Sequence, residues 1–219
     1  MPRLLFEKRG DAVWISHLDL MRLFQRAFKR AGLPLKHTQG FNPRPSVSIA
    51  LPLSVGVESA CELLDFDLEG DMPSYAEMRD SLNRSLVAGV RVLDIYDTGR
   101  KLRELSLLSC VVTLEYDQGI PDGCAEAIRE LFSGESLTVA KKGKNGPVEQ
   151  DVIPMIKKLD VHIADEHSVD ISAVICCQNP SMNPMQITGA VERYLPGYRP
   201  DHAVCRRNEL FDSEMKIFR

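Results

Sequence analysis

Residues 16–34 read SHLDLMRLFQRAFKRAGLP, and this stretch decides how the fold begins. Ser16 has the hydroxyl that a helix N-cap uses, and Asp19 stands where the acidic residue of a capping box belongs. Gly32 and Pro34 are stop signals of a helix. Between these ends an apolar face recurs at helical spacing, made of Leu20, Phe24, Ala27 and Ala31. The pattern therefore predicts a helix over residues 17–31.

Apolar and alternating stretches on both sides of this helix predict β-strands. Residues 4–6 read as a strand before it, and residues 12–15 are expected to continue in an extended conformation. The elements expected after the helix are strands at 46–51 and 62–68, a second helix at 73–87 and a strand at 90–96. This β-α-β-β-α-β order is typical of the ferredoxin-like split βαβ arrangement.

The second half of the chain shows the same order of elements, without a convincing residue-level repeat. Its expected strands are 107–116, 136–141, a strand near 161, 169–177 and 203–207; its expected helices are 122–132, 151–158 and 183–194, with a polar turn at 142–147. We therefore expect an α+β protein with two tandem ferredoxin-like (βαββαβ) halves and antiparallel sheets. The expected domains are residues 1–102 and 103–219.

Composition and motifs exclude several classes of protein. With 44% apolar and 26% charged residues, the chain has the balance of a globular protein. Its six cysteines contain no Cys-x-x-Cys pair, and its histidines form no His-Glu-x-x-His motif, so we expect no metal site in this chain. Charges near the first residue argue against a signal peptide, and no run of apolar residues is long enough to span a membrane. We expect a cytoplasmic protein, no membrane segment and buried, reduced thiols.

Positive charge is concentrated at the beginning of the sequence. Residues 1–50 contain nine Lys and Arg residues against three Asp and Glu residues, which gives +6. Residues 51–100 contain four basic and ten acidic residues, which gives −6, and the remainder contributes −4. A polyanion is therefore expected to contact the first fifty residues.

The basic residues of the first helix gather along one stripe, which consists of Arg22, Arg26, Lys29 and Arg30. The stripe is either an ordinary solvated helix face or, together with Lys36, His37 and Arg44, a surface that meets phosphates. Phe41 lies in the Gly- and Pro-punctuated segment 39–45, beside Asn42. An aromatic residue beside arginine in a loop is a common way to hold single-stranded nucleic acid, although such a loop also packs on itself.

Ser16, His17 and Asp19 allow a catalytic interpretation. His17 would be a general base oriented by Asp19, or Ser16 a nucleophile. Neighbouring residues at the start of a helix project in different directions, however, so they do not align as a triad by position alone. The alternative is that Ser16 and Asp19 cap the helix while His17 occupies its first turn.

Four strings together resemble the radical-SAM-associated (radical-SAM-linked) family of uncharacterised bacterial proteins: ISHLDLMR at 15–22, RAFKRAGLP at 26–34, QGFNPRP at 39–45 and LPLSVG at 51–56. Members of that family are encoded beside, or fused to the C-terminus of, a cobalamin-binding-type radical SAM protein. The resemblance is specific over residues 3–70 and looser afterwards. It marks His17, Asp19, Gly40, Phe41, Asn42 and Arg44 as motif positions but assigns no activity to them.

The resemblance implies a radical SAM partner that brings the iron–sulfur cluster, with no cofactor in this chain. Genes for ribosomal proteins and an RNA-processing nuclease often lie near those of the family, which favours a role with RNA. The first hypothesis is an accessory protein that docks with a radical SAM enzyme and presents an RNA substrate through the basic helix and the loop. The alternatives are a metal-independent ribonuclease or transferase that uses His17, and a pure protein-interaction subunit whose acidic segment 58–80 faces the partner.

Overall fold

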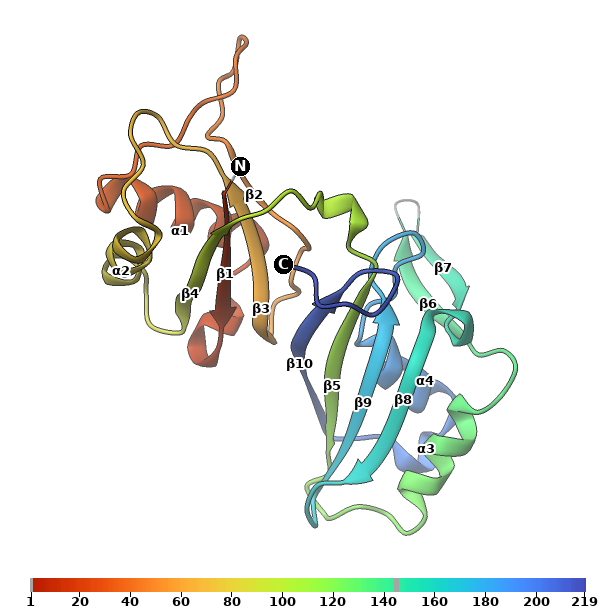
Figure 1. The fold of residues 1–219 in the computed structure, drawn as a ribbon. Coiled ribbons are helices and arrows are strands. Elements are labelled where there is room, and N and C mark those ends of the chain that lie inside the picture. The colour runs from red at the N-terminus through yellow and green to blue at the C-terminus, as the bar shows by residue number, and fades with distance from the viewer. Residues whose placement is uncertain (1, 144–145) are drawn as a thin grey trace. The chain divides into compact units, whose positions relative to one another are not determined.

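The computed structural model describes residues 2–143 and 146–219 and divides into two compact units. The N-terminal unit ends at Leu102 and also includes Arg219, and the C-terminal unit runs from Arg103 to Phe218. The short 3-10 helix η2 (Leu102–Glu104) spans the division. Helices and antiparallel strands make up both units, so the protein is of the α+β class, as the sequence predicts (Figure 1).

The N-terminal unit contains β1 (Pro2–Lys8), η1 (Gly10–Trp14), α1 (His17–Arg30), β2 (Val47–Ile49), β3 (Val57–Phe66), α2 (Tyr75–Ser85) and β4 (Val90–Asp97). Its strands lie in the order β4-β1-β3-β2, and every neighbouring pair is antiparallel. The two central strands are therefore β1 and β3. Both come from stretches rich in apolar residues, as expected for strands that form the floor of a core.

The core of this unit lies between the sheet and its two helices. The ring of Phe6 on β1 contacts that of Phe24 on α1 edge to face, with 4.7 Å between centroids. The ring of Phe28 meets that of Phe66 on β3 at 5.0 Å. Burial of such side chains contributes roughly 1.5–3 kcal/mol each and fixes α1 on the sheet. Of the predicted apolar face, Ala31 is only half-buried, because it is the C-cap, and Phe28 takes part instead.

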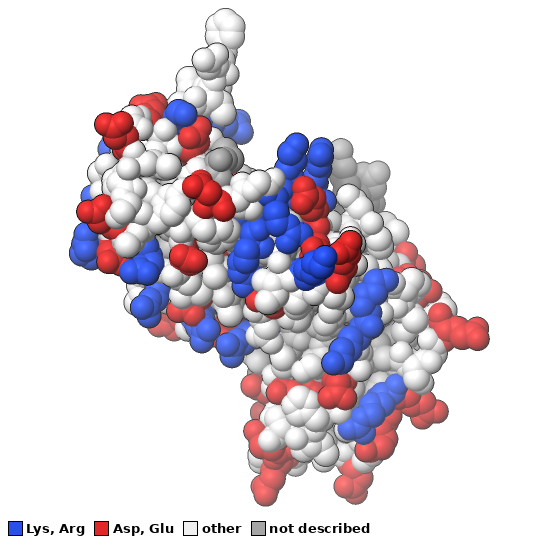
Figure 2. All heavy atoms as spheres, in the orientation of Figure 1, with Lys and Arg blue, Asp and Glu red and all other residues white. Residues whose placement is uncertain are grey.

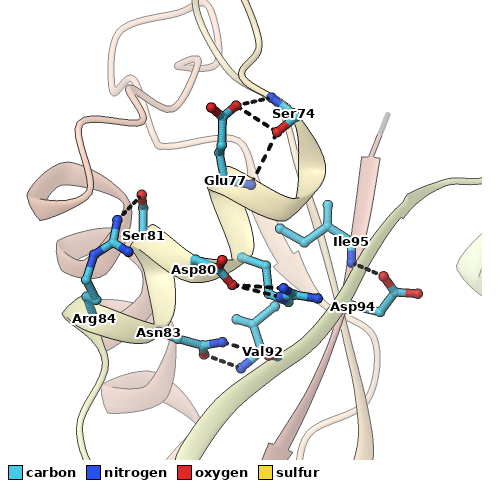
Figure 3. Close-up of polar contacts among 10 residues, drawn as sticks. Ser74, Glu77, Asp80, Ser81, Asn83, Arg84, Val92, Asp94 and Ile95 are labelled. Carbon is cyan, nitrogen blue, oxygen red and sulfur yellow. Dashed lines mark hydrogen bonds and ion pairs between the residues drawn. The ribbon is translucent and has the colours of Figure 1, made fainter.

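Helix α2 is held at the outer strand β4 by polar contacts (Figure 3). Ser74 and Glu77 form a complete capping box at the start of the helix. Near its end, the Asn83 side chain donates to the carbonyl of Val92 at 2.9 Å and accepts from the Val92 N–H at 2.8 Å. The Asn83 amide thus hydrogen-bonds to both the N–H and the carbonyl of Val92. Val92 lies beside the register shift in the pairing of β4 with β1.

The C-terminal unit contains β5 (Leu107–Glu115), α3 (Cys124–Phe132), β6 (Thr138–Gly143), β7 (Gly146–Asp151), η3 (Ile153–Met155), β8 (Ile156–Ile163), β9 (Ser168–Cys176), α4 (Gln186–Tyr194), η4 (Pro196–Tyr198) and β10 (His202–Phe211). Its main sheet has the order β10-β5-β9-β8, again antiparallel, and β6 and β7 form a separate hairpin. Ile128 on α3 and Val191 on α4 are fully buried, as is Leu114 on β5. The helices therefore share a core with the sheet.

The expectation that residues 12–15 are extended is wrong, because the 3-10 helix η1 runs from Gly10 to Trp14. Gly10 adopts a φ of +56°, which turns the chain after β1. The N–H of Ile15 then donates to the carbonyl of Ala12 at 3.0 Å. The buried Lys8 ammonium donates to the carbonyls of Val13 and Ile15, and burial lowers the pKa of Lys8. These contacts fix the chain just before α1.

The helix expected at residues 151–158 is also wrong. Only the three-residue 3-10 helix η3 forms in this segment, and β8 begins at Ile156. The carboxylate of Asp151 accepts from the N–H of Leu137 at 3.0 Å and from that of Ile153 at 3.2 Å, which closes the β6–β7 hairpin. Of the turn predicted at 142–147, residues 142–143 belong instead to β6 and residues 146–147 to β7, and residues 144 and 145 lie outside the described residues.

Two further observations concern the cysteines and the lengths of the helices. All six cysteines are buried and none is in a disulfide, which confirms the interpretation as buried thiols. Among the helices of residues 2–143 and 146–219, none is long and apolar enough to cross a membrane.

Candidate nucleic-acid interface

The start of α1 uses Ser16 and Asp19 as a cap. The Ser16 hydroxyl accepts from the backbone N–H of Asp19 at 3.2 Å and donates to its carboxylate at 2.8 Å. Arg22 donates to the other carboxylate oxygen at 3.0 Å. The hydrogen bond from Ser16 and then that from Arg22 lower the pKa of Asp19. The capping interpretation of Ser16 and Asp19 is confirmed.

His17 lies beside this cap without joining it. Its side chain is half-buried, and the Nδ1 atom is shielded from solvent without a hydrogen-bond partner among the described residues. The Ser16 hydroxyl donates to the Asp19 carboxylate, and that carboxylate also accepts from Arg22, so neither Ser16 nor Asp19 is linked to the Nδ1 atom of His17. A nucleophile–base–acid triad therefore does not form here.

A groove of about 570 Å³ opens beside the second half of α1. It is lined by Gln25, Arg26 and Lys29 of the helix, by Gly32, Leu33, Pro34, Leu35 and His37 of the segment that follows, and by Pro45 and Glu69. Leu33 and Leu35 are buried and belong to the core, so they form an apolar floor. The charged and amide side chains surround that floor. We call this feature the α1 groove.

The end of α1 explains why the groove exists. Gly32 adopts a φ of +72°, and the N–H of Leu33 donates to the carbonyl of Phe28 at 2.9 Å, which is a Schellman ending. The chain therefore reverses at the end of the helix. It next runs beside the segment after β3, where the N–H of Lys36 donates to the carbonyl of Asp67 at 2.9 Å, and the N–H of Glu69 to that of Pro34 at 2.8 Å.

Beyond His37 the chain leaves the unit as a narrow loop, residues 38–44, which we call the Phe41 loop. His37 and Pro45 pair at its base, and the N–H of Thr38 donates to the carbonyl of Arg44 at 2.8 Å. Phe41 is fully exposed. The loop is the orange protrusion at the top of Figure 1, and Figure 2 shows that its outer part carries no charge while both basic and acidic side chains lie near its base. The Phe41 ring is therefore presented to solvent instead of packing on the unit.

Several predicted phosphate-binding residues already have partners within the protein. Arg22 pairs with Asp19, and the Lys36 ammonium lies 3.1 Å from the carboxylate of Asp67. The Nδ1 atom of His37 lies 4.0 Å from the Glu69 carboxylate. Arg30 donates to the carbonyl of Ser85 after α2, so it ties the two helices together. These contacts leave the four side chains less available to an outside anion.

Arg26, Lys29 and Arg44 differ from the other cations. All three are exposed, and their side chains make no hydrogen bond or ion pair with any residue in the described part of the chain. Arg26 and Lys29 lie on the rim of the α1 groove, and Arg44 lies near the base of the Phe41 loop. Asn42 is exposed in the same loop. The structure thus brings the basic helix and the loop together at one surface.

The catalytic candidates lie at the other end of α1. At a rise of 1.5 Å per residue, the nine steps from His17 to Arg26 correspond to about 13.5 Å along the helix axis. Neither His17 nor Asp19 lines the α1 groove. The predicted catalytic residues and the cations that line the groove therefore lie at two separate sites on α1.

Sequence reasoning missed the walls of the groove. The apolar run from Gly32 to Leu35 lies between a helix stop and a basic loop, and it could have indicated the apolar lining of the groove. Glu69 could not have been found in this way, because only the pairing of its N–H with the Pro34 carbonyl brings it to the groove. Within the described residues, no three His, Cys, Asp or Glu side chains gather in a metal-binding arrangement.

Comparison with known proteins adds a family and a distant likeness of fold. The model of the DUF2344 family, described as an uncharacterized protein conserved in bacteria, matches residues 2–184. No curated protein matches the sequence significantly. A chain in the crystal structure of a Cbf5-Nop10-Gar1 complex is similar at a TM-score of 0.52 and 7% identity, over 95% of this chain and 48% of that chain, so this chain spans about half its length. An unknown protein from Galdieria sulphuraria covers 94% of this chain and 96% of its own at 11% identity, but its TM-score of 0.27 supports no argument.

Proposed function

Since the chain belongs to the DUF2344 family of uncharacterised bacterial proteins, we propose that it is a cytoplasmic accessory protein of a radical SAM enzyme and binds RNA, or presents an RNA substrate, through α1 and the Phe41 loop. The α1 groove is the observation that supports the binding of RNA. Arg26 and Lys29 line it without a hydrogen bond or ion pair to any described residue, and its lining also includes His37 and Pro45, which pair at the base of the loop that exposes Phe41. Cationic side chains beside a stacking aromatic are the usual means of holding a single strand.

The radical SAM partner rests on the resemblance of residues 15–56 to the radical-SAM-linked proteins. In this proposal the partner supplies the iron–sulfur cluster and the chemistry, and this chain contributes no cofactor. Its role would be to bind the substrate and to dock with the enzyme. The proposal assigns Arg26, Lys29, Phe41 and Arg44 to the substrate.

We also infer that each unit is a ferredoxin-like half. The order of strands supports this inference. Numbered along the chain within each main sheet, the four strands lie as fourth, first, third and second in both units. In each unit a helix follows the first strand and another precedes the last, as in a βαββαβ fold. The similarity to the Cbf5-Nop10-Gar1 structure concerns the fold alone and lends no function.

The experiment for RNA binding compares two charge reversals of equal size. The double variant Arg26→Glu/Lys29→Glu alters the groove, and Arg79→Glu/Arg84→Glu alters α2 of the same unit. Binding of a fluorescently labelled RNA is measured by anisotropy at low salt. We expect at least about a tenfold loss of affinity for the groove variant and little change for the α2 variant, since the net charge of both is equal. Equal losses would show that only overall charge matters and would contradict the proposal.

One observation favours a second function, an enzyme that acts through His17: its shielded Nδ1 atom has no partner among the residues that the structure describes. Cleavage or transfer of RNA by the isolated protein, abolished in a folded His17→Ala variant, would establish it.

The docking role has its own test. Complex formation with the radical SAM protein is measured by size-exclusion chromatography, with and without RNA. The accessory proposal predicts a complex that retains RNA through Arg26 and Lys29. A complex that forms but never binds RNA would instead indicate a pure interaction subunit, with the acidic segment 58–80 as its first candidate surface.

A further inference from the structure

The α1 groove has the composition of a site for a flat, mostly apolar group with a polar edge. We propose that it holds one unpaired base of a single-stranded RNA, with the adjoining phosphate against Arg26 and Lys29; this inference rests on the proposed function. Its volume of about 570 Å³ lies within the ordinary range of small-ligand sites. The floor and walls come from apolar side chains, namely Leu33, Pro34, Leu35 and Pro45.

The polar groups at the groove are suited to the edge of a base. Gln25 presents an amide, which both donates and accepts hydrogen bonds. His37 and Glu69 face each other at 4.0 Å and add an imidazole and a carboxylate. A phosphate alone would need only the cations and would gain nothing from the leucine floor. A purely apolar ligand would leave the Gln25 amide without a partner, which is unfavourable.

The phosphate contacts follow from the cations on the rim. Arg26 and Lys29 are one helical turn apart on α1, so their charged groups lie on the same side of the helix. Neither makes a hydrogen bond or ion pair with a described residue, so an incoming phosphate does not have to displace an existing ion pair. A strand whose base enters the groove would therefore bring its backbone to these two side chains.

Single strands are favoured over duplexes for a geometric reason. In a double helix each base is stacked and paired, so none can enter a groove without being extruded, which costs a few kcal/mol. Phe41 strengthens the preference, because an exposed ring stacks on an unpaired base. His37 lines the groove and also stands at the base of the loop, and the four residue steps from His37 to Phe41 span at most about 14 Å. A strand of a few nucleotides can therefore contact both features.

The test measures binding of a fluorescein-labelled ten-nucleotide RNA as a single strand, as a duplex with its complement, and as the DNA strand of the same sequence. We expect the single-stranded RNA to bind at least about tenfold more tightly than the duplex. Gln25→Trp would fill the groove and weaken single-strand binding by about 5- to 150-fold, the range known for loss of one stacked base. Leu18→Trp adds the same ring at an exposed position of α1 that does not line the groove, and it serves as the matched control.

A second measurement needs no variant and so does not depend on how Gln25→Trp folds. Single bases of the RNA are replaced in turn by 2-aminopurine, whose fluorescence reports its surroundings. One position is expected to change on binding to the wild-type protein far more than its neighbours. A uniform response along the strand would contradict the insertion of a base.

The outcomes separate the inference from the proposed function. Equal affinity for single strand and duplex, with binding still lost in Arg26→Glu/Lys29→Glu, would overturn the base site and leave RNA binding intact. Absence of RNA binding would overturn both. Equal binding of single-stranded DNA would support the base site and show that the ribose is not read. Displacement of the RNA by a poly-glutamate peptide of equal charge would assign the groove to peptides and overturn the inference.

Discussion

The salt dependence of RNA binding follows from the three unpaired cations of the interface. Arg26, Lys29 and Arg44 make no ion pair with any residue that the structure describes. For a single strand, each neutralised phosphate contributes about −0.7 to the slope of log K against log salt, so three contacts predict a slope of about −2. Between 50 and 200 mM salt, the affinity should fall by roughly 20-fold. Arg26→Ala/Lys29→Ala should leave a slope of about −0.7 and a fall of about threefold.

The assay is a titration of labelled single-stranded RNA by anisotropy at four salt concentrations. Arg22→Ala is the matched control, because Arg22 lies on the same helix but is paired with Asp19 at 3.0 Å. Its slope should stay close to that of the wild type. The reasoning is refuted if Arg22→Ala lowers the slope as much as removal of Arg26 or Lys29 does. That result would mean that the whole face of α1 acts as a uniform positive surface and that the cations of the groove contribute no more to RNA binding than Arg22 does.

Three further predictions concern stability and the role of single residues. Asn83→Ala removes two hydrogen bonds to β4 and should lower the free energy of unfolding by about 2 kcal/mol in urea titrations, whereas unchanged stability would show that water replaces both bonds. The contacts of Ser16 and Arg22 lower the pKa of Asp19 from 3.8, so their stabilisation is present at neutral pH and is lost as the pH falls below that value. Asp19→Asn should therefore flatten this part of an acid-unfolding curve. An acid-unfolding curve identical to that of the wild type would count against the contacts. Phe41→Ala should weaken RNA binding by about 5- to 150-fold without a change in thermal unfolding, since the ring is fully exposed, and a lowered melting temperature would contradict that exposure.

The sequence predicted local structure well where one element carries its own signals. Ser16, Asp19 and Gly32 specify both ends of α1 through contacts within a few residues, so the helix bounds were almost correct. Leu20 and Phe24 repeat at helical spacing and are buried as expected. The failures arose where distant contacts decide. The segment after Gly10 looked extended, yet it forms η1 and is held by distant backbone contacts, from the N–H of Arg9 to the carbonyl of Gly89 and from the N–H of Gly56 to the carbonyl of Val13.

The candidate site was foreseen in part. Its cations and the aromatic loop were visible as residue types, but the sequence could not tell which cations were already paired. Lys36 looks equivalent to Lys29 in the sequence, and only the structure places Asp67 beside it. Such partners come from the pairing of segments that are far apart in the chain, which no local pattern records. The same reason hid Glu69 from the prediction.

The central claim, that RNA lies in the α1 groove beside the Phe41 loop, is tested most directly by photo-crosslinking. Single-stranded RNA with 4-thiouridine is irradiated with the wild-type protein, and the attached peptides are identified by mass spectrometry. The account predicts that the crosslinks concentrate in residues 25–45. Crosslinks that fall in residues 103–218, or are spread evenly over the exposed basic side chains, would contradict it.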